Sequence, residues 1–524
     1  MRLDYLRAGP GWSPFRIKYL ACTIILFSVT AICAPDIQQV RSDDPRRSLK
    51  QAEKLIKKGS LTEAEKILLD VVAAAPDNST AKLRLAFVYL KQRRLLNAYE
   101  ISFAIAKAEP KNSQAFAILG ATLLSAGKFA EARTVFHNSI KLNKREALAW
   151  AGLGLLDFYE NRITESLQNL QEAVFYDSSQ PDYFFALAQV SARSDKYTEA
   201  AEAYYKFLSI SRDTDDERRA RIKSLISFLR FLGHKQTLYV TRNGAQTAVR
   251  FKLTGNRPVI EVRINSSRET LNFVLDTGSG ISVISDKTAK RLKINPVAKG
   301  GFATGIGGTG KFDIVYGFLR RVDIGKVEIG NVPVYIRKFH SDNDDIDGYI
   351  GLSLISKFLT TIDYGSLTFT LSAAKALDGA VVADHSVLLP LRLTSSGFLS
   401  GEVLLEGIDA PLNFIVDTGA SVSVISDEVA NRQGISRFVK NETMRVIGAA
   451  GIIDNVPQFL LPRVCFGTHS RKSVTAIALD LDMVNEVSGF EQAGILGGNF
   501  LRNYRVTFDF KNSKVIFVPI SLEQ

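Results

Sequence analysis

One stretch of sequence, built around Asp-Thr-Gly, occurs twice in this chain of 524 residues. The first copy covers residues 271–279 and the second covers residues 412–420, and in both an apolar run leads directly into the triplet. A carboxylate placed straight after an apolar strand is costly unless a partner shares its surroundings. The repeat therefore predicts two related β segments whose carboxylates, Asp276 and Asp417, act on each other.

Each β segment carries two further features in the same order. A glycine-rich turn follows each triplet, and such a hairpin can fold over an extended peptide and supply backbone hydrogen bonds. The second turn is the shorter of the two and has no tyrosine. An apolar pair before a glycine then follows, with Gly351 lying 75 residues after Asp276 and Gly497 lying 80 after Asp417. The turn residues expected to contact substrate are Gly305, Ile306, Gly307, Gly308, Gly448, Ala449, Ala450 and Gly451.

On these motifs, the last 290 or so residues resemble retropepsin-like aspartic proteases in tandem. The second copy matches that family's signature from Asp417 to Ile425, and the first has Ser279 where the signature has alanine. The resemblance implies an all-β, bilobal protease with lobes at 238–378 and 384–524, and no cofactor or metal. It makes Asp276 and Asp417 the catalytic pair. The residues expected to support this pair are Thr277, Gly278, Thr418 and Gly419, each threonine hydroxyl bonding a backbone group to lock its turn.

The resemblance also implies a mechanism. Two carboxylates about 3 Å apart cannot both ionise cheaply, so they share one proton. The ionised partner would take a proton from a water molecule while the protonated one donates to the scissile carbonyl of a peptide or protein substrate. This sharing predicts an acid to near-neutral optimum. The sequence leaves open whether the lobes pair within one chain or between two chains.

Residues 45–214 repeat with a period of 34, which indicates a helical array. Small residues occupy two fixed columns, as close-packed antiparallel helices require. The columns are Ala64, Ala98, Ala132, Ser166 and Ala200, and Ala52, Ala86, Gly120, Gly154 and Ala188. The pattern resembles about five tetratricopeptide repeats and predicts an all-α solenoid that recruits a substrate or a protein partner. Apolar residues spaced along the charged stretch at 215–237 predict one more helix, a cap or linker.

The first 34 residues resemble a targeting segment. Basic residues precede an apolar run from Tyr19 to Ala34, and 16 residues are few for a membrane-spanning helix. We expect a signal peptide, or a membrane anchor through residues 16–34, and in either case export to a bacterial periplasm or the outer side of a membrane. The exported body then holds a single cysteine, Cys465, so it has no internal disulfide.

Composition excludes one class of partner. The net charge is +12, but 66 basic and 54 acidic residues are interspersed without a long basic run, so we expect no nucleic-acid binding. The five histidines lack the spacing of metal ligands. Two alternatives to a protease remain open on the sequence: a peptide-binding module that no longer cuts, and an adaptor whose β lobes only assist assembly.

Overall fold

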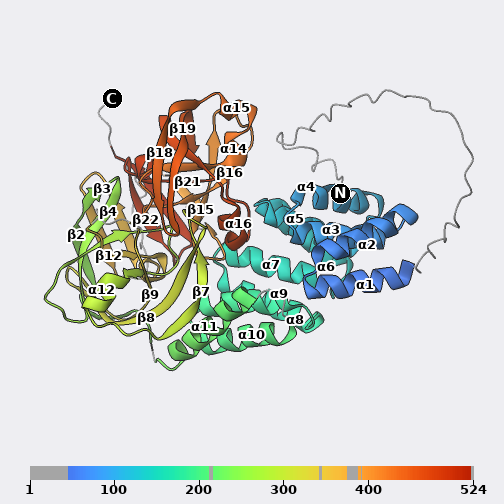
Figure 1. Ribbon diagram of the computed structural model, residues 1–524, viewed down its shortest axis with the longest axis horizontal. Helices are drawn as coiled ribbons and strands as arrows, with labels where there is room; N and C mark the ends of the chain where they lie inside the picture. The colour runs from blue at the N-terminus through green and yellow to red at the C-terminus, as the bar shows by residue number, and fades with distance from the viewer. Residues whose placement is uncertain are drawn as a thin grey trace, which may run out of the picture.

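The computed structural model describes residues 45–211, 216–235, 237–340, 345–373, 387–390 and 392–520. The expected targeting segment at residues 1–34 lies outside the described residues. Within the part that is described, no helix is both long and apolar enough to cross a membrane. A curved array of helices, coloured blue to green in Figure 1, lies beside a β-rich region coloured yellow-green to red.

Between residues 45 and 211 the chain forms ten helices, arranged as five antiparallel pairs that we call the helical arm. The arm helices, followed by the single helix α11, are α1 (Pro45–Lys58), α2 (Leu61–Ala74), α3 (Ser79–Lys91), α4 (Leu95–Ala108), α5 (Ser113–Ser125), α6 (Phe129–Leu142), α7 (Ala147–Tyr159), α8 (Ile163–Tyr176), α9 (Pro181–Arg193), α10 (Tyr197–Ile210) and α11 (Asp216–Gly233).

The small-residue columns allow these helices to pack closely. A Cβ added at Gly120 would lie 2.7 Å from the Phe136 ring, and one added at Gly154 would lie 2.6 Å from Leu170. Such distances are too short for real contacts, so a larger residue at either position would push paired helices apart. The predicted helical-repeat fold is therefore confirmed, and its columns form the seams between helices.

Two β-rich lobes follow. Lobe 1 consists of β1 (Val240–Asn243), β2 (Gln246–Arg250), β3 (Lys252–Thr254), β4 (Arg257–Ile264), β5 (Leu271–Leu275), β6 (Val283–Ser285), α12 (Asp286–Arg291), β7 (Ala298–Thr304), β8 (Lys311–Ile324), β9 (Val327–Arg337), β10 (Gly348–Ile350), α13 (Leu352–Ile355), β11 (Leu359–Asp363) and β12 (Thr368–Ser372). Lobe 2 consists of β13 (Val387–Pro390), β14 (Arg392–Leu393), β15 (Leu399–Leu405), β16 (Leu412–Val416), β17 (Ser423–Ser426), α14 (Asp427–Ala430), α15 (Gln433–Ser436), β18 (Val439–Gly448), β19 (Gly451–Phe466), β20 (His469–Leu479), α16 (Asp482–Ser488), β21 (Gly494–Leu496), α17 (Gly498–Leu501), β22 (Tyr504–Asp509) and β23 (Lys514–Pro519).

The two lobes share one topology around the triplets. In lobe 1, β10 inserts between β5 and β6, parallel to the first and antiparallel to the second. In lobe 2, β21 inserts in the same way between β16 and β17. The apolar pairs that precede Gly351 and Gly497 therefore belong to β10 and β21, the strands that hold the triplet turns in place. In lobe 1, for example, the Asp276 N–H donates to the Ile350 carbonyl of β10 at 3.0 Å.

A six-stranded sheet joins the lobes, with strand order β13-β23-β22-β11-β12-β2. At its centre β11 of lobe 1 pairs antiparallel with β22 of lobe 2, and the hydroxyls of Thr361 and Thr507 lie 2.9 Å apart. Buried side chains of both lobes, such as Phe273 and Phe414, belong to one hydrophobic core. The predicted all-β, bilobal fold is confirmed, and the shared sheet makes the lobes a single unit.

The helical arm docks onto lobe 2 through Phe490. This side chain is fully buried, and its ring lies 4.9 Å from that of Phe129 and 5.1 Å from that of Tyr159. Beside it, Arg193 of α9 donates to the Thr394 carbonyl at 2.7 Å. An aromatic side chain inserted into the core of the arm fixes the position of the arm relative to the β lobes.

Helix α11 packs on lobe 1, against the hairpin formed by β7 and β8 (Figure 1). The rings of Phe228 and Tyr316 stack with centroids 4.5 Å apart, and both side chains are buried. Ser224 donates to the Lys299 carbonyl at 2.9 Å. The helix expected as a cap or linker therefore also covers the outer face of the first glycine-rich hairpin.

Candidate active site

Thr277 and Thr418 form a reciprocal set of hydrogen bonds between the lobes. Thr277 Oγ1 donates to the Val416 carbonyl at 2.7 Å and accepts from the Thr418 N–H at 3.0 Å. Thr418 Oγ1 donates to the Leu275 carbonyl at 2.7 Å and accepts from the Thr277 N–H at 3.1 Å. Each hydroxyl bonds a backbone group, as the sequence indicates, but that group belongs to the opposite lobe. The two triplets are thus held against each other within one chain.

The glycines of the triplets let the carboxylates meet. A Cβ added at Gly278 would lie 2.3 Å from Asp417 Cγ, and one added at Gly419 would lie 2.6 Å from Asp276 Cγ. The N–H of each glycine donates to the aspartate two residues before it, at 2.9 Å for Asp276 and 2.7 Å for Asp417. Only glycine fits where a neighbouring side chain approaches this closely. The structure brings together Asp276, Asp417 and the four residues that the sequence assigns to their support.

The pKa values of Asp276 and Asp417 are both raised. Burial, followed by the charge and hydrogen bond of Asp417, raises the pKa of Asp276 well above its ordinary range. Burial also raises the pKa of Asp417, but hydrogen bonds from the Gly419 N–H and from Asp276 oppose that rise. Two neighbouring carboxyl groups in this setting share one proton. The shared proton belongs to the pair as a whole, because burial raises the pKa of both carboxyl groups above the ordinary range of aspartate.

Two hairpins, which we call flap 1 and flap 2, meet above the aspartates. Flap 1 is β7–β8 and flap 2 is β18–β19; their tips contain all eight of the predicted turn residues. The Ala450 N–H donates to the Ile306 carbonyl at 2.9 Å, and a Cβ at Gly448 would lie 2.0 Å from that same carbonyl oxygen. Flap 2 has a short turn, as its sequence indicates, but its strands are long because β19 spans Gly451–Phe466.

A cavity of about 1140 Å³ extends from the aspartates, beneath the flap tips, to the helical arm. Its wall on the arm side includes Phe185 and Gln189 of α9, Tyr204 of α10 and Arg221 of α11. The cavity is therefore bounded by both lobes, both flaps and the arm. The sequence does not indicate that the arm forms part of this wall, because a helical repeat pattern reports which residues are buried and not what lies beside them.

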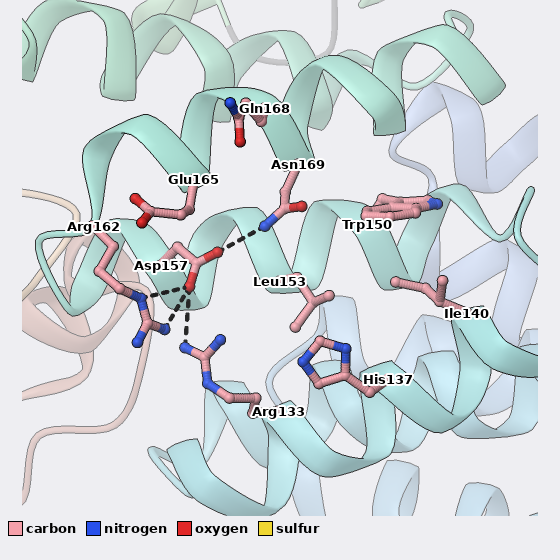
Figure 2. Close-up of a pocket in the computed structure, with 10 residues that line it drawn as sticks. All are labelled: Arg133, His137, Ile140, Trp150, Leu153, Asp157, Arg162, Glu165, Gln168 and Asn169. Carbon is pink, nitrogen blue, oxygen red and sulfur yellow. Dashed lines mark hydrogen bonds and ion pairs between the residues drawn. The ribbon is translucent and has the colours of Figure 1, made fainter.

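A second cavity, of about 380 Å³, lies within the arm between α6, α7 and α8 (Figure 2). Its polar groups bind one another: the buried Asp157 accepts hydrogen bonds from Arg133, Arg162 and Asn169. These contacts stabilise the packing of three helices. Across the described residues, no cluster of three or more histidine, cysteine or acidic side chains is arranged to hold a metal ion.

Comparison with known proteins gives two family matches. The aspartyl protease family matches residues 260–354 and 402–500, one segment in each lobe, and the tetratricopeptide repeat family matches residues 152–215. The chain thus carries aspartyl protease and tetratricopeptide segments, as the sequence motifs predict. No curated protein matches the chain.

Among solved structures, a thermophilic tetratricopeptide protein of Thermus thermophilus is 20% identical, with a TM-score of 0.31, and the match covers 35% of this chain and 99% of that one. An aspartic proteinase from Irpex lacteus is 15% identical, with a TM-score of 0.37, over 53% of this chain and 98% of that one.

Proposed function

We propose that this chain is an aspartic endopeptidase whose catalytic pair is Asp276 and Asp417. The main support is that two Asp-Thr-Gly turns, one from each lobe, meet at a cavity that lies beneath two flaps. Carboxyl groups with raised pKa values that face a cleft are typical of acid–base catalysis. The aspartyl protease family match in both lobes supports the same activity.

We propose that the shared proton starts on Asp276 and that Asp417 starts as the ionised partner. Asp417, the ionised partner, takes a proton from a water molecule that attacks the carbonyl carbon of the scissile bond. Asp276, which holds the shared proton, donates it to the carbonyl oxygen, and a tetrahedral diol forms. When the C–N bond breaks, Asp417 gives its proton to the leaving nitrogen and Asp276 recovers the proton of the diol. No covalent intermediate with the protein is formed.

The flaps would hold an extended substrate. In this structure the backbone groups at the two tips bond one another, as the hydrogen bond from Ala450 to Ile306 shows. When the tips separate, these groups become available to bind the backbone of a substrate. Extended peptides are commonly bound in this way, through main-chain hydrogen bonds that tolerate varied side chains. Separation of the tips is therefore the step that admits a peptide to Asp276 and Asp417.

We also propose that the helical arm recruits the substrate directly. Side chains of α9 and α10 line the same cavity as the catalytic pair, so a polypeptide that reaches the aspartates passes along the arm. Tetratricopeptide arrays present curved surfaces suited to binding extended segments. An unfolded protein should accordingly be a better substrate than a short peptide.

Export is a further part of the proposal. The sequence of residues 1–34 and the presence of a single cysteine in the remaining chain support a location outside the cytoplasm. Fractionation of producing cells, with determination of the N-terminus of the mature protein, tests this part. A chain that remains in the cytoplasmic fraction with its first residues intact would contradict export.

The experiment that tests the catalytic proposal is cleavage of casein between about pH 4 and pH 7, the range suited to a shared proton. The wild-type chain is compared with Asp276→Asn and Asp417→Asn, and with Asp409→Asn as a control at an exposed carboxylate of lobe 2. We expect cleavage by the wild type and the control alone. Binding of casein without cleavage by the wild type would instead favour a peptide-binding module on a protease fold.

A further inference from the structure

Arg337 is a cation placed inside the proposed substrate cavity. It ends strand β9, is half-buried, and lines the cavity together with the catalytic pair. Its guanidinium lies 5.2 Å from the ring centre of Phe312, 4.8 Å from that of Phe339 and 5.6 Å from that of Tyr349. Three rings around a planar cation restrict its position and remove part of its hydration.

The polar partners of Arg337 are backbone carbonyl groups. Its Nη1 donates to Ala449 at the tip of flap 2 at 3.1 Å, and to Lys338 at 3.4 Å. Among the described residues, no carboxylate lies within the 4.0 Å of an ion pair with this guanidinium. A guanidinium has five N–H donors, and a carboxylate can bind two of them in parallel. The two carbonyl groups therefore use only part of the hydrogen-bonding capacity of the Arg337 guanidinium, and they carry no charge to balance it.

The contact with Ala449 depends on the closed position of flap 2. When the flap tips separate to admit a peptide, the carbonyl of Ala449 moves with flap 2 while Arg337 stays on lobe 1. Leaving a partly desolvated cation without a partner costs free energy. Binding of a substrate group that replaces the Ala449 carbonyl is therefore favoured. A carboxylate replaces it best because it adds charge complementarity to the hydrogen bonds.

The charge of the whole cavity agrees with this preference. Among the described residues that line it, seven are lysine or arginine and five are aspartate or glutamate, two of the five being the catalytic pair. Since that pair shares one proton, the lining is positive overall. The Arg337 charge also reaches the catalytic centre, because it lowers the pKa of Asp276 against the larger effects of burial and Asp417.

We propose that Arg337 is a specificity-determining residue that binds the carboxylate of an acidic side chain of the substrate, close to the scissile bond. The inference rests on the proposed peptidase function and names its substrate class: extended polypeptides with a glutamate or aspartate beside the bond that is cut. Arg337 selects the substrate and takes no part in proton transfer.

The test uses quenched fluorescent peptides that differ only by glutamate or glutamine, with the substitution moved along the positions on each side of the scissile bond. At one position the full-length wild type should cleave the glutamate peptide with a kcat/KM at least about tenfold higher, as expected for a hydrogen-bonded charge. Arg337→Gln should abolish that ratio, Arg337→Lys should retain part of it, and Arg337→Glu should favour a lysine peptide instead.

Arg445→Gln is the matched control. It removes the same charge from the same cavity, but the Arg445 guanidinium already lies 3.3 Å from Asp454 on flap 2. The glutamate preference should persist in this variant. If Arg337→Gln instead changes kcat/KM equally for glutamate and glutamine peptides, Arg337 only holds flap 2 closed and the proposal is wrong.

A binding measurement separates this inference from the proposed activity. Fluorescence anisotropy with the same peptide sequences, carrying the fluorophore but no quencher, is measured on Asp417→Asn, and on Asp417→Asn combined with Arg337→Gln, after thermal unfolding has shown that both are folded. A tighter Kd for the glutamate peptide that requires Arg337 supports the inference even if the wild type cleaves nothing. Equal Kd values for the two peptides at every position on Asp417→Asn would overturn it.

Discussion

Replacement of Thr418 by valine tests the hydrogen bonds that hold the two triplets together. Valine matches threonine in shape but has no hydroxyl, and Thr418 is 1% exposed. The change removes the bond to the Leu275 carbonyl and leaves the Thr277 N–H without an acceptor. Thr418→Ser is the matched control because it keeps the hydroxyl and loses only a methyl group.

The expected magnitude follows from the two buried backbone groups that lose their partners. Each such group costs about 1–3 kcal/mol, so Thr418→Val should lower the free energy of unfolding of the β lobes by about 2–6 kcal/mol. Loss of one buried methyl group in Thr418→Ser should cost about 1 kcal/mol. The valine variant should also cleave casein poorly, because the catalytic carboxylates are positioned by the turns that these bonds join.

Urea unfolding followed by circular dichroism measures the difference. Tryptophan fluorescence is unsuitable because Trp150 of α7 is the only tryptophan among the described residues, so that signal reports on the arm. The arm and lobes need not unfold together, so the transition assigned to β structure is compared between variants. Equal midpoints and equal cleavage for Thr418→Val and Thr418→Ser would show that the Thr418 hydroxyl does not hold the triplets together.

Three further substitutions test the docking of the arm, the anchoring of flap 1 and the acidity of the catalytic pair. Phe490→Ala should weaken docking of the arm on lobe 2 by about 3–5 kcal/mol, so small-angle scattering should show a larger radius of gyration; an unchanged radius would contradict this. Phe228→Ala should release flap 1 from α11, so hydrogen exchange in β7 should become faster than in the wild type, with β18 of flap 2 as the internal control. Finally, the pKa of Asp276 is raised above the ordinary 3.8, so the folded chain keeps a proton that the unfolded chain releases, and stability should fall as pH rises from about that value. Asp276→Asn should reduce this fall and be the more stable protein at neutral pH, as urea unfolding at several pH values would show.

The sequence predicts the features that local patterns encode. The paired triplets indicate Asp276 and Asp417, and the glycine-rich turns indicate the flap tips, because each motif fixes a backbone conformation within a few residues. The columns of small residues predict the helical pairs for the same reason: Gly120 must be small because Phe136 packs on it.

Contacts between separately folded parts are not predicted. Phe490 lies in a loop without periodicity, and nothing in its neighbourhood indicates that it inserts into the helical arm. The Thr277 and Thr418 hydroxyls are expected to bond a backbone group, but the sequence does not show that the bonds cross between lobes. Arg337 resembles any basic residue at a strand end until the structure places Ala449, 112 residues away, against it.

A mixing experiment shows whether Asp276 and Asp417 of one chain form the catalytic pair. Purified Asp276→Asn and Asp417→Asn are each assayed for casein cleavage at acid pH, alone and after mixing in equal amounts. We expect each variant to be inactive alone and the mixture to be inactive too, because neither chain contains an intact pair. Cleavage by either variant alone, or its recovery in the mixture through lobes that pair between chains, would show that the two aspartates of one chain do not form the catalytic pair.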